Sequence, residues 1–431
     1  MKLLVVGGGG REHAIIKKLR ENPEVETIYA LPGNGGIAAD AVCVPQIGAK
    51  DISAIVDFAV EHQVDFAVVA PDDPLALGCV DTLHDAGIPC FGPDAKAARI
   101  ESSKVFSKNL MKKYGIPTAD YQVFHDPKEA MVYLEGASFP IVIKADGLAL
   151  GKGVLIPQNL DEARDAVKTI MEDKAFGDSG NEIVIEQFLT GPEVSVLAFT
   201  DGTAIRPMVS SMDHKRAGDG DTGLNTGGMG TVAPNPCYTP EIAQVCMDTI
   251  FLPTLAAMSA EGCPFKGCLY FGLMLTPDGP KVIEYNCRFG DPETQVVLPL
   301  LESDLLKIMT ACTEGTLADT EVKFSDGAAA CVILASGGYP VAYEKGKPIT
   351  GLVDGQLPDE PDVTVYHSGT AIAEDGQLVT NGGRVLGVTA TAPGLPRAIA
   401  IAYEAAEHIH FDKLHKRTDI GMRALKALAE E

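Results

Sequence analysis

Glu284 and Asn286 are the residues whose types and spacing most directly suggest chemistry. They stand two positions apart in the stretch KVIEYNCRFGDPETQ, and residues two apart on a β-strand point to the same face of the sheet. A carboxylate and an amide oxygen on one face suit Mg²⁺, which usually binds one or two protein oxygens and completes its shell with substrate phosphates. The stretch therefore predicts a metal site that also holds phosphate.

Arg288 follows with the same parity and carries a guanidinium, a planar fork that binds a carboxylate or a phosphate through two hydrogen bonds. If the strand continues to this residue, Arg288 shares the metal-binding face. Two alternatives stay open at this point. The side chain stabilises a transferred phosphoryl group, or it forms a structural ion pair with Asp291 or Glu293.

Lys144 ends the apolar run Pro140–Lys144 and is followed by the loop DGLALGKGV. A buried lysine is costly unless an anion meets it, and a glycine-rich loop offers backbone N–H groups that can hold a polyphosphate. The loop is not a Walker A motif, because the stretch from Gly147 to Gly153 does not satisfy G-x-x-x-x-G-K-[ST]. The alternative is a solvated hairpin tip.

The stretch IVIEQFLTGPEVSV reads as two strands with a short break between them. A connector of this kind can bind an adenine through backbone groups while Glu193 takes ribose hydroxyls. Glu186 lies on the other side of the break, seven residues earlier. The alternative is a strand pair with exposed carboxylates.

The four glycines Gly7–Gly10 join an apolar run to a helix-like stretch. The dinucleotide pattern G-x-G-x-x-G fails here, because its third glycine position holds Glu12 or His13, depending on the starting glycine. A different phosphate bound at the helix N-terminus is favoured, and a turn that merely permits tight packing is the alternative.

Residues 211–231 form a long polar stretch rich in glycine. Such a stretch is uncommon inside a compact domain and is often a lid or a binding loop, with disorder as the alternative. The sequence contains no G-x-S-x-G and no H-E-x-x-H, and none of its ten cysteines has neighbours that mark a nucleophile.

The elements that must position these residues follow a βαβ rhythm over residues 1–100, which predicts a parallel sheet with helices on both faces. Ligands bind such sheets at the carboxyl ends of the strands. The expected strands in this part are 2–7, 26–31, 41–44, 64–70 and 88–91, and the expected helices are 11–21, 51–61, 75–86 and 94–100. Further on, helices are expected at 103–114, 160–173, 239–260 and 396–409, and strands at 140–144, 183–187, 193–200, 267–276 and 280–286.

Composition limits the classes of protein. A chain of 431 residues predicts two to four domains with ample core. No run of 18 apolar residues is present, so no transmembrane helix is expected. The net charge of −24 argues against general binding to nucleic acid or anionic membranes. Ten scattered cysteines without a C-x-x-C motif predict a reducing, cytoplasmic location.

Lys104, Lys144, the glycine-rich loop, the connector after Glu186 and the Glu284-x-Asn286-x-Arg288 pattern together resemble the ATP-grasp ligases. More narrowly, the sequence is similar to the glycinamide ribonucleotide synthetase family from residue 5 to about 424. The stretches that carry this similarity are GGGGREHA, KADGLALGKGV, DHKRAGDGDTGLNTGGMG, EYNCRFGDPETQ, CVILASGGYP and GGRVLGVTA.

The resemblance implies an α/β fold in three parts: an N-terminal parallel-sheet preATP-grasp domain at 1–103, an ATP-grasp core at 104–326 with a mobile lid at 119–192, and a C-terminal α+β domain at 327–431. It implies that ATP, glycine and 5-phosphoribosylamine give ADP, phosphate and glycinamide ribonucleotide through glycyl phosphate. The implied partners are these small molecules, without nucleic acid or membrane, and the expected state is a monomer or weak homodimer.

The resemblance also assigns roles to individual residues. The metal, Mg²⁺ or Mn²⁺, would bind Glu284 and Asn286. The catalytic residues would be Arg288, Asp213 and Lys215. ATP would bind Lys104, Lys144, Gly151, Lys152, Gly153, Glu186, Phe188, Leu189 and Glu193. The other substrates would bind Gly9, Arg11, Asp72, Asn225, Gly227, Gly228 and Asp291, with the four-glycine turn facing the phosphoribosylamine.

Two departures from the family pattern stand out. Asp72 occupies a position where the family usually has glutamate, so a substrate contact there is shorter by one methylene. The strand before Glu284, which reads FGLML, lacks the third acid found in many ATP-grasp enzymes. The rival hypotheses are another ATP-grasp carboxylate–amine ligase, an NAD-dependent oxidoreductase and a non-catalytic nucleotide sensor.

Overall fold

The first hundred residues form a five-stranded parallel sheet, as the βαβ rhythm predicts. In the computed structural model, which describes residues 1–148 and 153–430, the strand order is β3-β2-β1-β4-β5. Strand β1 reads KLLVVG and is buried at all but its first residue, because packed elements cover both faces of the sheet. The strands are β1 (Lys2–Gly7), β2 (Thr27–Pro32), β3 (Val42–Cys43), β4 (Phe66–Val69) and β5 (Cys90–Phe91).

The helices of this part differ from expectation at one place. The helix expected at 75–86 begins earlier, at Asp72, and is broken at Gly78, whose φ of 82° lies in the left-handed region. Glycine adopts this conformation without a steric penalty, so it commonly ends a helix. The helices are α1 (Gly10–Leu19), α2 (Ile52–Glu61), α3 (Asp72–Ala76), α4 (Cys79–Asp85), α5 (Ala95–Ser102) and α6 (Lys104–Tyr114).

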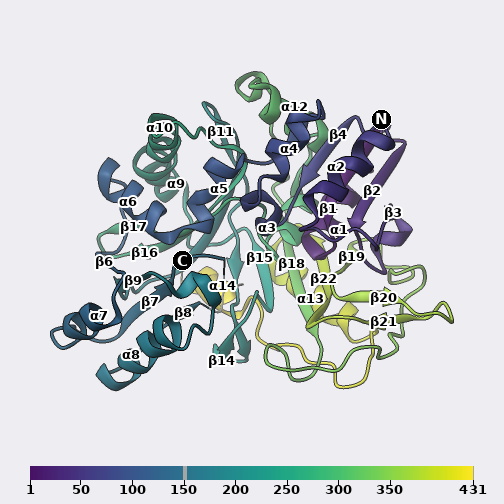
Figure 1. Ribbon diagram of the computed structural model, residues 1–431. Coiled ribbons are helices and arrows are strands. Elements are labelled where there is room, and N and C mark those ends of the chain that lie inside the picture. Colours follow the sequence, from purple (N-terminus) through teal and green to yellow (C-terminus); the bar gives the residue numbers. More distant parts are fainter. Residues whose placement is uncertain (149–152, 431) are drawn as a thin grey trace.

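A small antiparallel sheet of order β6-β9-β7-β8 follows and lies at the lower left of Figure 1. Helices α7 and α8 contribute to a separate hydrophobic cluster with this sheet. Strand β6 and helix α7 were not expected from the sequence, because their residues are mostly half-buried or exposed and give a weak apolar pattern. The elements are β6 (Tyr121–Phe124), α7 (Pro127–Leu134), β7 (Ile141–Ala145), β8 (Val154–Leu155), α8 (Leu160–Val167), a π-helical turn η2 (Lys168–Glu172) and β9 (Ile183–Gln187).

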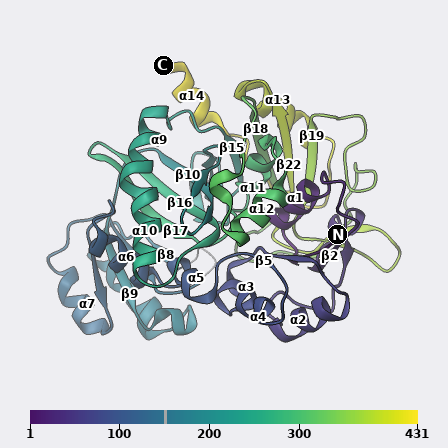
Figure 2. The same ribbon diagram turned by 90° about the horizontal axis from the view of Figure 1, so that it is seen from above.

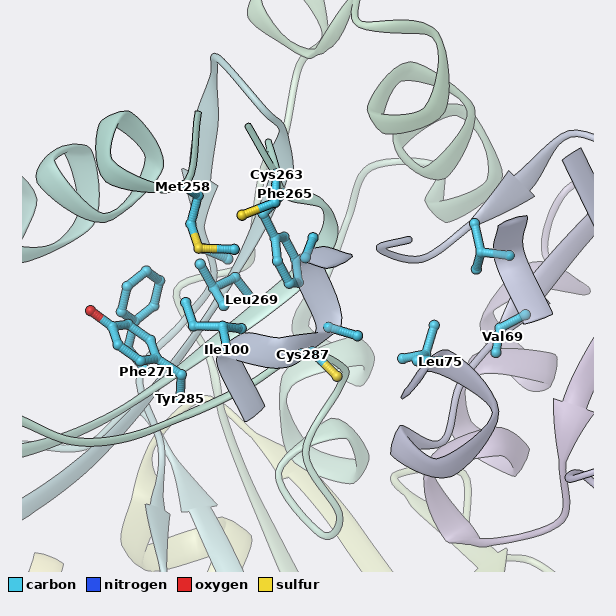
Figure 3. Packing of buried hydrophobic residues seen from close by; sticks show 14 of the residues in the cluster. Val69, Leu75, Ile100, Met258, Cys263, Phe265, Leu269, Phe271, Tyr285 and Cys287 are labelled. Atoms are coloured by element: carbon cyan, nitrogen blue, oxygen red, sulfur yellow. The ribbon is translucent and has the colours of Figure 1, made fainter. Parts of the chain in front are cut away.

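A larger antiparallel sheet of order β11-β10-β16-β17 carries the candidate metal residues. One continuous helix packs against it, and Figure 3 shows Met258 of this helix beside Leu269 and Phe271 of β16. The elements are β10 (Glu193–Asp201), β11 (Ile205–Pro207), α9 (Pro240–Cys246), a π-helical segment η4 (Met247–Phe251), α10 (Leu252–Ala260), β16 (Lys266–Thr276) and β17 (Gly279–Asn286).

The sequence predicts no membrane-spanning helix, and the helix Pro240–Ala260 tests this expectation. By length and apolar composition it is, among the described residues, the one helix that could cross a bilayer. Its inner face nevertheless packs in the protein: Phe251 is 1% exposed, and the Thr254 hydroxyl lies 2.8 Å from the Tyr285 hydroxyl of β17. In this fold the segment is a core helix.

The polar stretch 211–231 is ordered into short strands rather than a loop. Its two outer strands, β12 (Met212–Asp213) and β15 (Gly230–Ala233), join the C-terminal sheet, whose order is β12-β15-β18-β22-β19. Its two inner strands, β13 (Arg216–Gly218) and β14 (Thr222–Asn225), form a hairpin. The C-terminal sheet thus takes two strands from before residue 327, and the boundary there stays a prediction.

The remaining elements complete the C-terminal part. Figure 2 shows α11 and α12 near the middle of the molecule. Helix α11 contacts α1 and strands β15, β18 and β22 of the C-terminal sheet, whereas α12 contacts α1, β5, β10 and β16. These elements are α11 (Thr294–Val297), α12 (Leu305–Glu314), β18 (Ala328–Ala335), β19 (Val363–His367), β20 (Thr370–Ile372), β21 (Leu378–Thr380), β22 (Arg384–Ala392), α13 (Leu395–Ala406) and α14 (Met422–Glu430).

Two buried histidines join the N-terminal and C-terminal sheets. The backbone N–H of His367 donates to His13 Nδ1 at 2.8 Å, and His13 Nε2 lies 2.9 Å from Asp40 Oδ2. Burial lowers the pKa of both imidazoles, that of His367 to about 4. A neutral His13 therefore accepts at one nitrogen and donates to the carboxylate at the other. Gly36 packs directly against the His367 ring.

We expect Gly36→Ala to destabilise the protein by about 1–3 kcal/mol, because overpacking a fixed interface forces side chains and backbone to move. An added Cβ would lie 2.0 Å from His367 Cγ, although the backbone of Gly36 is in the right-handed helical region that alanine accepts. Urea unfolding measures the effect. Gly48→Ala is the matched control, since nothing lies within 4 Å of its Cβ position. Equal stability of the two variants would contradict the packing argument.

Candidate active site

Glu186 lies buried between two lysines. Lys144 Nζ, from the end of β7, is 3.0 Å from Glu186 Oε1, and Lys108 Nζ, from α6, is 3.0 Å from Glu186 Oε2. Lys144 also donates to the backbone carbonyl of Ile283 at 3.0 Å. Burial lowers the pKa of Lys108 to about 8 even though the carboxylate opposes this shift. Two cations share one anion, so the group keeps an excess positive charge that can meet phosphate.

Lys104 stands at the start of α6, and its ammonium donates to the carbonyl of Gly147 at 2.8 Å. Burial, with help from the nearby Lys144 ammonium, lowers the pKa of Lys104. Asp146 ties the glycine-rich loop to the same helix end, because it accepts from the N–H of Val105 at 3.0 Å. The two predicted phosphate lysines are therefore neighbours.

The glycine-rich loop is described only in part. Gly151 and Lys152, which the resemblance assigns to ATP, lie outside the described residues. Gly153 is buried, and its carbonyl accepts from the N–H of Ala145 at 2.9 Å. It therefore lies beside the carboxyl end of β7.

Glu284 and Asn286 lie on β17, as the spacing predicts. Both side chains are partly exposed while Tyr285 between them is buried, which places the pair on one face. Upstream the register of β16 and β17 shifts by one residue at Ile283, and this irregularity exposes the carbonyl that Lys144 contacts.

Lys215 accompanies the candidate metal pair. Its ammonium is 3.3 Å from Glu284 Oε1 and 3.8 Å from Glu193 Oε2. The Lys215 charge holds the pKa of Glu284 down to about 2, and the Glu284 carboxylate in turn raises the pKa of Lys215 well above its usual range. An ionised carboxylate and an amide oxygen are the hard oxygen donors that Mg²⁺ prefers, so the donor set fits the predicted ion.

The acids around the metal pair are few, as the sequence indicates. Strand β16, which pairs with β17, carries no acidic residue. Within residues 1–148 and 153–430, no group of three or more His, Cys, Asp or Glu side chains has the arrangement of a metal cage. Substrate oxygens would therefore have to complete the coordination.

The strand ends at Asn286, as expected, so Arg288 lies beyond it and does not share its face by strand geometry. Its guanidinium still reaches the same place, donating through Nη2 to Asn286 Oδ1 at 3.0 Å and to Glu101 Oε1 at 2.8 Å. The ion-pair partner is Glu101 of α5, and not Asp291 or Glu293 as the sequence suggested. Glu101 also accepts from the N–H of Cys287 at 2.7 Å, which fixes the turn after β17.

The connector between β9 and β10 spans residues 188–192. Phe188 and Leu189 are half-buried in it, next to the strand that ends with Glu186 and Gln187. Gly191 lets the connector pass close to β16, since a Cβ there would lie 2.1 Å from the carbonyl oxygen of Leu275. Glu193 opens β10 with a half-exposed carboxylate.

Asp213 has a carboxyl group near the Lys215 ammonium. Burial raises its pKa well above the usual range, and the nearby carboxylate of Glu293 adds to the shift. Gly228 packs against it, with its Cβ position 2.7 Å from Asp213 Oδ1. Glu293 itself is buried and accepts from the Tyr270 hydroxyl at 3.2 Å.

The four-glycine turn does not leave a free helix N-terminus. The N–H of Gly9 donates to Glu12 Oε2 at 2.6 Å, and the N–H of Arg11 lies 3.4 Å from Asp291 Oδ2. The Arg11 guanidinium bonds to Glu12 and to the carbonyl of Phe289. The chain's own carboxylates thus take the place expected for a phosphate.

A cavity of about 360 Å³ opens beside this turn. Its lining consists of glycines and residues with polar side chains, from stretches that are far apart in the sequence. The lining residues are Gly8, Gly9, Gly33, Asn34, Asp291, Tyr339, Ser368, Gly369, Thr370, Asn381 and Arg384. Gly9 and Asp291 are among the residues expected at a substrate site, whereas Arg11 is not in the lining.

The other predicted substrate residues lie around this cavity's rim or apart from it. Gly227 and Gly228 present their carbonyls to Arg384 Nη1 at 2.9 and 3.4 Å. Asn225 ends β14 opposite Arg216. Asp72 lies at the start of α3, and its charge contributes to the raised pKa of Glu101 and of Arg288. It therefore lies on the metal side of the site, near Arg288, and not at the cavity.

Several residues of the site were missed from the sequence. Lys108 follows Lys104 by four positions, which puts both on one face of α6, and this spacing was a usable signal. Glu101 and Arg384 gave no local signal, because their partners are 187 and 93 or more residues away. Asn34, Ser368, Thr370 and Asn381 are ordinary loop residues whose convergence only the fold reveals.

Comparison with known proteins covers nearly the whole chain. The phosphoribosylglycinamide synthetase N domain matches residues 1–101, its ATP-grasp (A) domain residues 102–294, and its C domain residues 329–423. A phosphoribosylamine–glycine ligase of Vibrio vulnificus (strain YJ016) is 46% identical over 427 residues, with 99% of each chain covered.

Solved structures give the same picture. The crystal structure of a phosphoribosylamine–glycine ligase from Thermotoga maritima is 36% identical, with a TM-score of 0.84, and covers 97% of this chain and 100% of that chain. A biotin carboxylase domain from Hydrogenobacter thermophilus, in complex with ADP and magnesium, is 17% identical with a TM-score of 0.75, covering 96% of this chain and 91% of that chain. The second likeness shows a shared fold.

We expect Lys144→Met to weaken ATP binding roughly 10- to 100-fold, the range for losing a charged hydrogen-bond donor. Isothermal titration calorimetry with ATP measures the loss. Lys113→Met is the matched control, because Lys113 lies on α6 and pairs with Glu261 at the surface, away from Glu186. Unchanged ATP affinity of Lys144→Met would remove this lysine from the phosphate site.

Proposed function

Because the chain belongs to the phosphoribosylglycinamide synthetase family, we propose that it joins glycine to 5-phosphoribosylamine with ATP, giving glycinamide ribonucleotide, ADP and phosphate. The observation that carries this proposal is the pairing of two sites. A cationic group of Lys104, Lys144 and Lys215 surrounds Glu284, and a separate polar cavity lies beside Asp291 and Arg384.

The first step makes glycine reactive. A carboxylate is a poor electrophile, and transfer of the γ-phosphoryl group converts it to glycyl phosphate, whose phosphate is a good leaving group. Phosphoryl transfer depends on positioning and on charge neutralisation. Lys104 and Lys144 hold the phosphates, and Lys215 offsets charge at the reacting end. Glu284 and Asn286 would hold Mg²⁺, or alternatively Mn²⁺, which would supply further charge neutralisation when bound.

Arg288 orients the glycine carboxylate beside the transferred phosphoryl group. Glu101 fixes one edge of its guanidinium. Its Nε atom is buried and has no hydrogen-bond partner within the described part of the chain. A buried unpaired donor is costly, and a substrate carboxylate would satisfy it. This supports a glycine or acyl-phosphate role for Arg288.

The second step joins the two substrates. The amine nitrogen of phosphoribosylamine attacks the acyl carbon, the carbon–oxygen bond to phosphate breaks, and the nitrogen loses one proton. Asp213 accepts that proton, since its raised pKa makes it a better base than an ordinary carboxylate. Gly228 packs against Asp213, and the carbonyl of Gly228 contacts Arg384 at the cavity.

The cavity holds the sugar phosphate. Side chains of Asn34, Ser368, Thr370 and Asn381 suit ribose hydroxyls and phosphate oxygens, and Arg384 supplies a positive charge. Gly8 and Gly9 of the four-glycine turn line this cavity, so the turn serves this substrate rather than a dinucleotide. Gly227 and Gly228 lie at its rim through Arg384, whereas Arg11 lies outside the lining and Asp72 lies on the metal side.

The segment 119–192 acts as a lid over the nucleotide. It has its own hydrophobic cluster, so it can move as a unit about the connector that holds Phe188 and Leu189. Closure would exclude water and protect glycyl phosphate from hydrolysis. Glu193 would take the ribose hydroxyls of ATP at the base of this lid.

The rival hypotheses fare worse. Full-length similarity to phosphoribosylamine–glycine ligases disfavours another ATP-grasp substrate pair, and the failed glycine pattern disfavours an NAD-dependent oxidoreductase. The chain acts in the cytoplasm as a monomer or weak homodimer, with small-molecule partners alone. Its net charge of −24 supports the lack of nucleic-acid or anionic-membrane partners.

An omission assay tests the proposal. ADP release is measured with ATP, Mg²⁺, glycine and freshly generated phosphoribosylamine, each omitted in turn. The proposal requires that steady ADP release needs both glycine and phosphoribosylamine. Release that another amine supports equally well would favour a different ATP-grasp ligase.

We expect Glu284→Gln to lower kcat by roughly 100-fold or more, because a preorganised charge that positions the metal is lost. Thermal unfolding of the variant should stay close to that of the parent protein. Asp278→Asn, at the exposed turn between β16 and β17, is the control. Near-normal turnover of Glu284→Gln at ordinary Mg²⁺ would show that this carboxylate does not hold the metal.

A further inference from the structure

Lys215 directly precedes the β13–β14 hairpin, whose strands are too short to stabilise it alone. Strands β13 and β14 contain three and four residues, and β14 is exposed except at its last residue. An isolated two-stranded hairpin of this length is marginal in water. Asp221 at its tip has a φ of 55°, an uncommon conformation for a residue other than glycine. Something outside the hairpin must therefore order it.

The segment 415–423, which we call the C-terminal clasp, supplies this order. It precedes and begins α14, which emerges next to β15 in both Figure 1 and Figure 2. On the tip of the hairpin, the N–H of Thr418 donates to Asp219 Oδ1 at 2.8 Å, and the N–H of Gly220 donates to Asp419 Oδ2 at 2.8 Å. His415 Nε2 lies 2.7 Å from the carbonyl of Ala217.

Arg417 is the centre of the clasp. It is 1% exposed and makes two hydrogen bonds to Asp419, at 2.7 and 2.8 Å. Its Nη1 donates to Asp221 Oδ1 at 2.9 Å and to the carbonyl of Arg216 at 3.2 Å. A guanidinium has donors enough for all these acceptors at once. It thereby joins the hairpin tip to the residue directly after Lys215.

The clasp also holds the residues that precede Lys215. The N–H of Gly421 donates to His214 Nε2 at 3.1 Å, and Arg423 Nη2 donates to the carbonyl of Asp213 at 3.0 Å. His214 Nδ1 lies 2.9 Å from the carbonyl of Gly230, so the ring donates there and accepts from Gly421. Burial lowers the pKa of His214 to about 4, which keeps the ring neutral as these two bonds require.

The backbone on both sides of Lys215 is therefore fixed by a segment about 200 residues further along the chain. The carbonyl of Lys215 itself accepts from the N–H of Thr226 at 2.7 Å, across the base of the hairpin. What remains free is the side chain, which reaches Glu284. A long lysine finds one acceptor reliably only when its backbone does not move.

We propose that Arg417 is a positioning residue of the ligase reaction: through the C-terminal clasp it holds Lys215 opposite Glu284 for phosphoryl transfer. This inference rests on the proposed function of Lys215 and Glu284. It makes the segment 415–423 a support of the nucleotide site, although Arg417 itself bonds to neither Lys215 nor Glu284.

Steady-state kinetics test the proposal on the full chain. Arg417→Met should lower kcat roughly 10- to 100-fold, because misplacing a catalytic group by about 1 Å has effects of that size. The KM for ATP should change by less than about twofold, since Lys104 and Lys144 are untouched. The kcat of Arg417→Lys should lie between that of Arg417→Met and that of the parent protein, because lysine keeps the charge but not the planar fork. Lys416→Met is the control, because Lys416 adjoins Arg417 in the chain but its ammonium pairs with Glu407 and not with the hairpin.

Asp221→Gly tests the same contact from the exposed side and avoids loss of a buried arginine. Glycine accepts the φ of 55°, so the change removes only the carboxylate. Asp359→Gly is the matched control, since Asp359 is an exposed aspartate with a φ of 62°. Asp221→Gly should lower kcat in the same direction as Arg417→Met, and Asp359→Gly should not.

Hydrogen exchange provides a readout independent of activity. In Arg417→Met and Asp221→Gly, the amides of residues 215–226 should exchange at least about tenfold faster than in the parent protein. Exchange in the parallel sheet should stay unchanged. Faster exchange with an unchanged kcat would overturn the proposal and leave the clasp a purely structural contact. Unchanged exchange would also overturn it. If the parent protein itself releases no ADP in the omission assay, the proposed function fails, whereas the exchange result still decides whether the clasp orders the hairpin.

Discussion

The pairing of closely spaced cationic side chains with carboxylates is the constraint on which this candidate site depends. Lys144 and Lys108 face Glu186, Lys215 faces Glu284, and Arg288 faces Glu101. Positive groups gathered this closely would repel one another and lose hydration if they stood alone. Each carboxylate offsets that cost and fixes a direction for its partner. The arrangement also explains how a chain with a net charge of −24 can collect anionic substrates at one place.

These pairs join parts of the chain that are far apart in sequence. Glu101 lies in the last turn of α5, just before the helix that bears Lys104 and Lys108, so one helix junction positions both Arg288 and these two lysines. In the small sheet, Lys144 and Glu186 lie on the neighbouring strands β7 and β9. Glu284 lies on the larger sheet. These charged groups come from different sheets and helices. The site therefore forms only when those parts of the chain pack together. Interfaces such as that between His13 and His367 therefore serve the chemistry as well as the stability.

Much of the fold and part of the site could be predicted from the sequence. The parallel sheet, the strand with Glu284 and Asn286, and the long helix at 240–260 follow from apolar periodicity, and the three-part α/β fold is confirmed. The break at Gly78 and the small elements β6 and α7 were missed, because local patterns there are short and weak. Lys104 and Lys144 came together as expected. The partners Glu101, Arg384 and Arg417 could not be found, since their meaning depends on contacts across 93 to 201 residues.

The register shift at Ile283 has a consequence for how the site tolerates change. It turns a main-chain carbonyl toward Lys144, and a main-chain acceptor is present whatever side chain occupies the position. Replacing Ile283 by another residue therefore preserves this contact, whereas inserting or deleting one residue in β17 would rotate Glu284 and Asn286 to the opposite face. The site is robust to substitution here and intolerant of changes in strand length. In related sequences we therefore expect substitutions at position 283, and no insertions or deletions there.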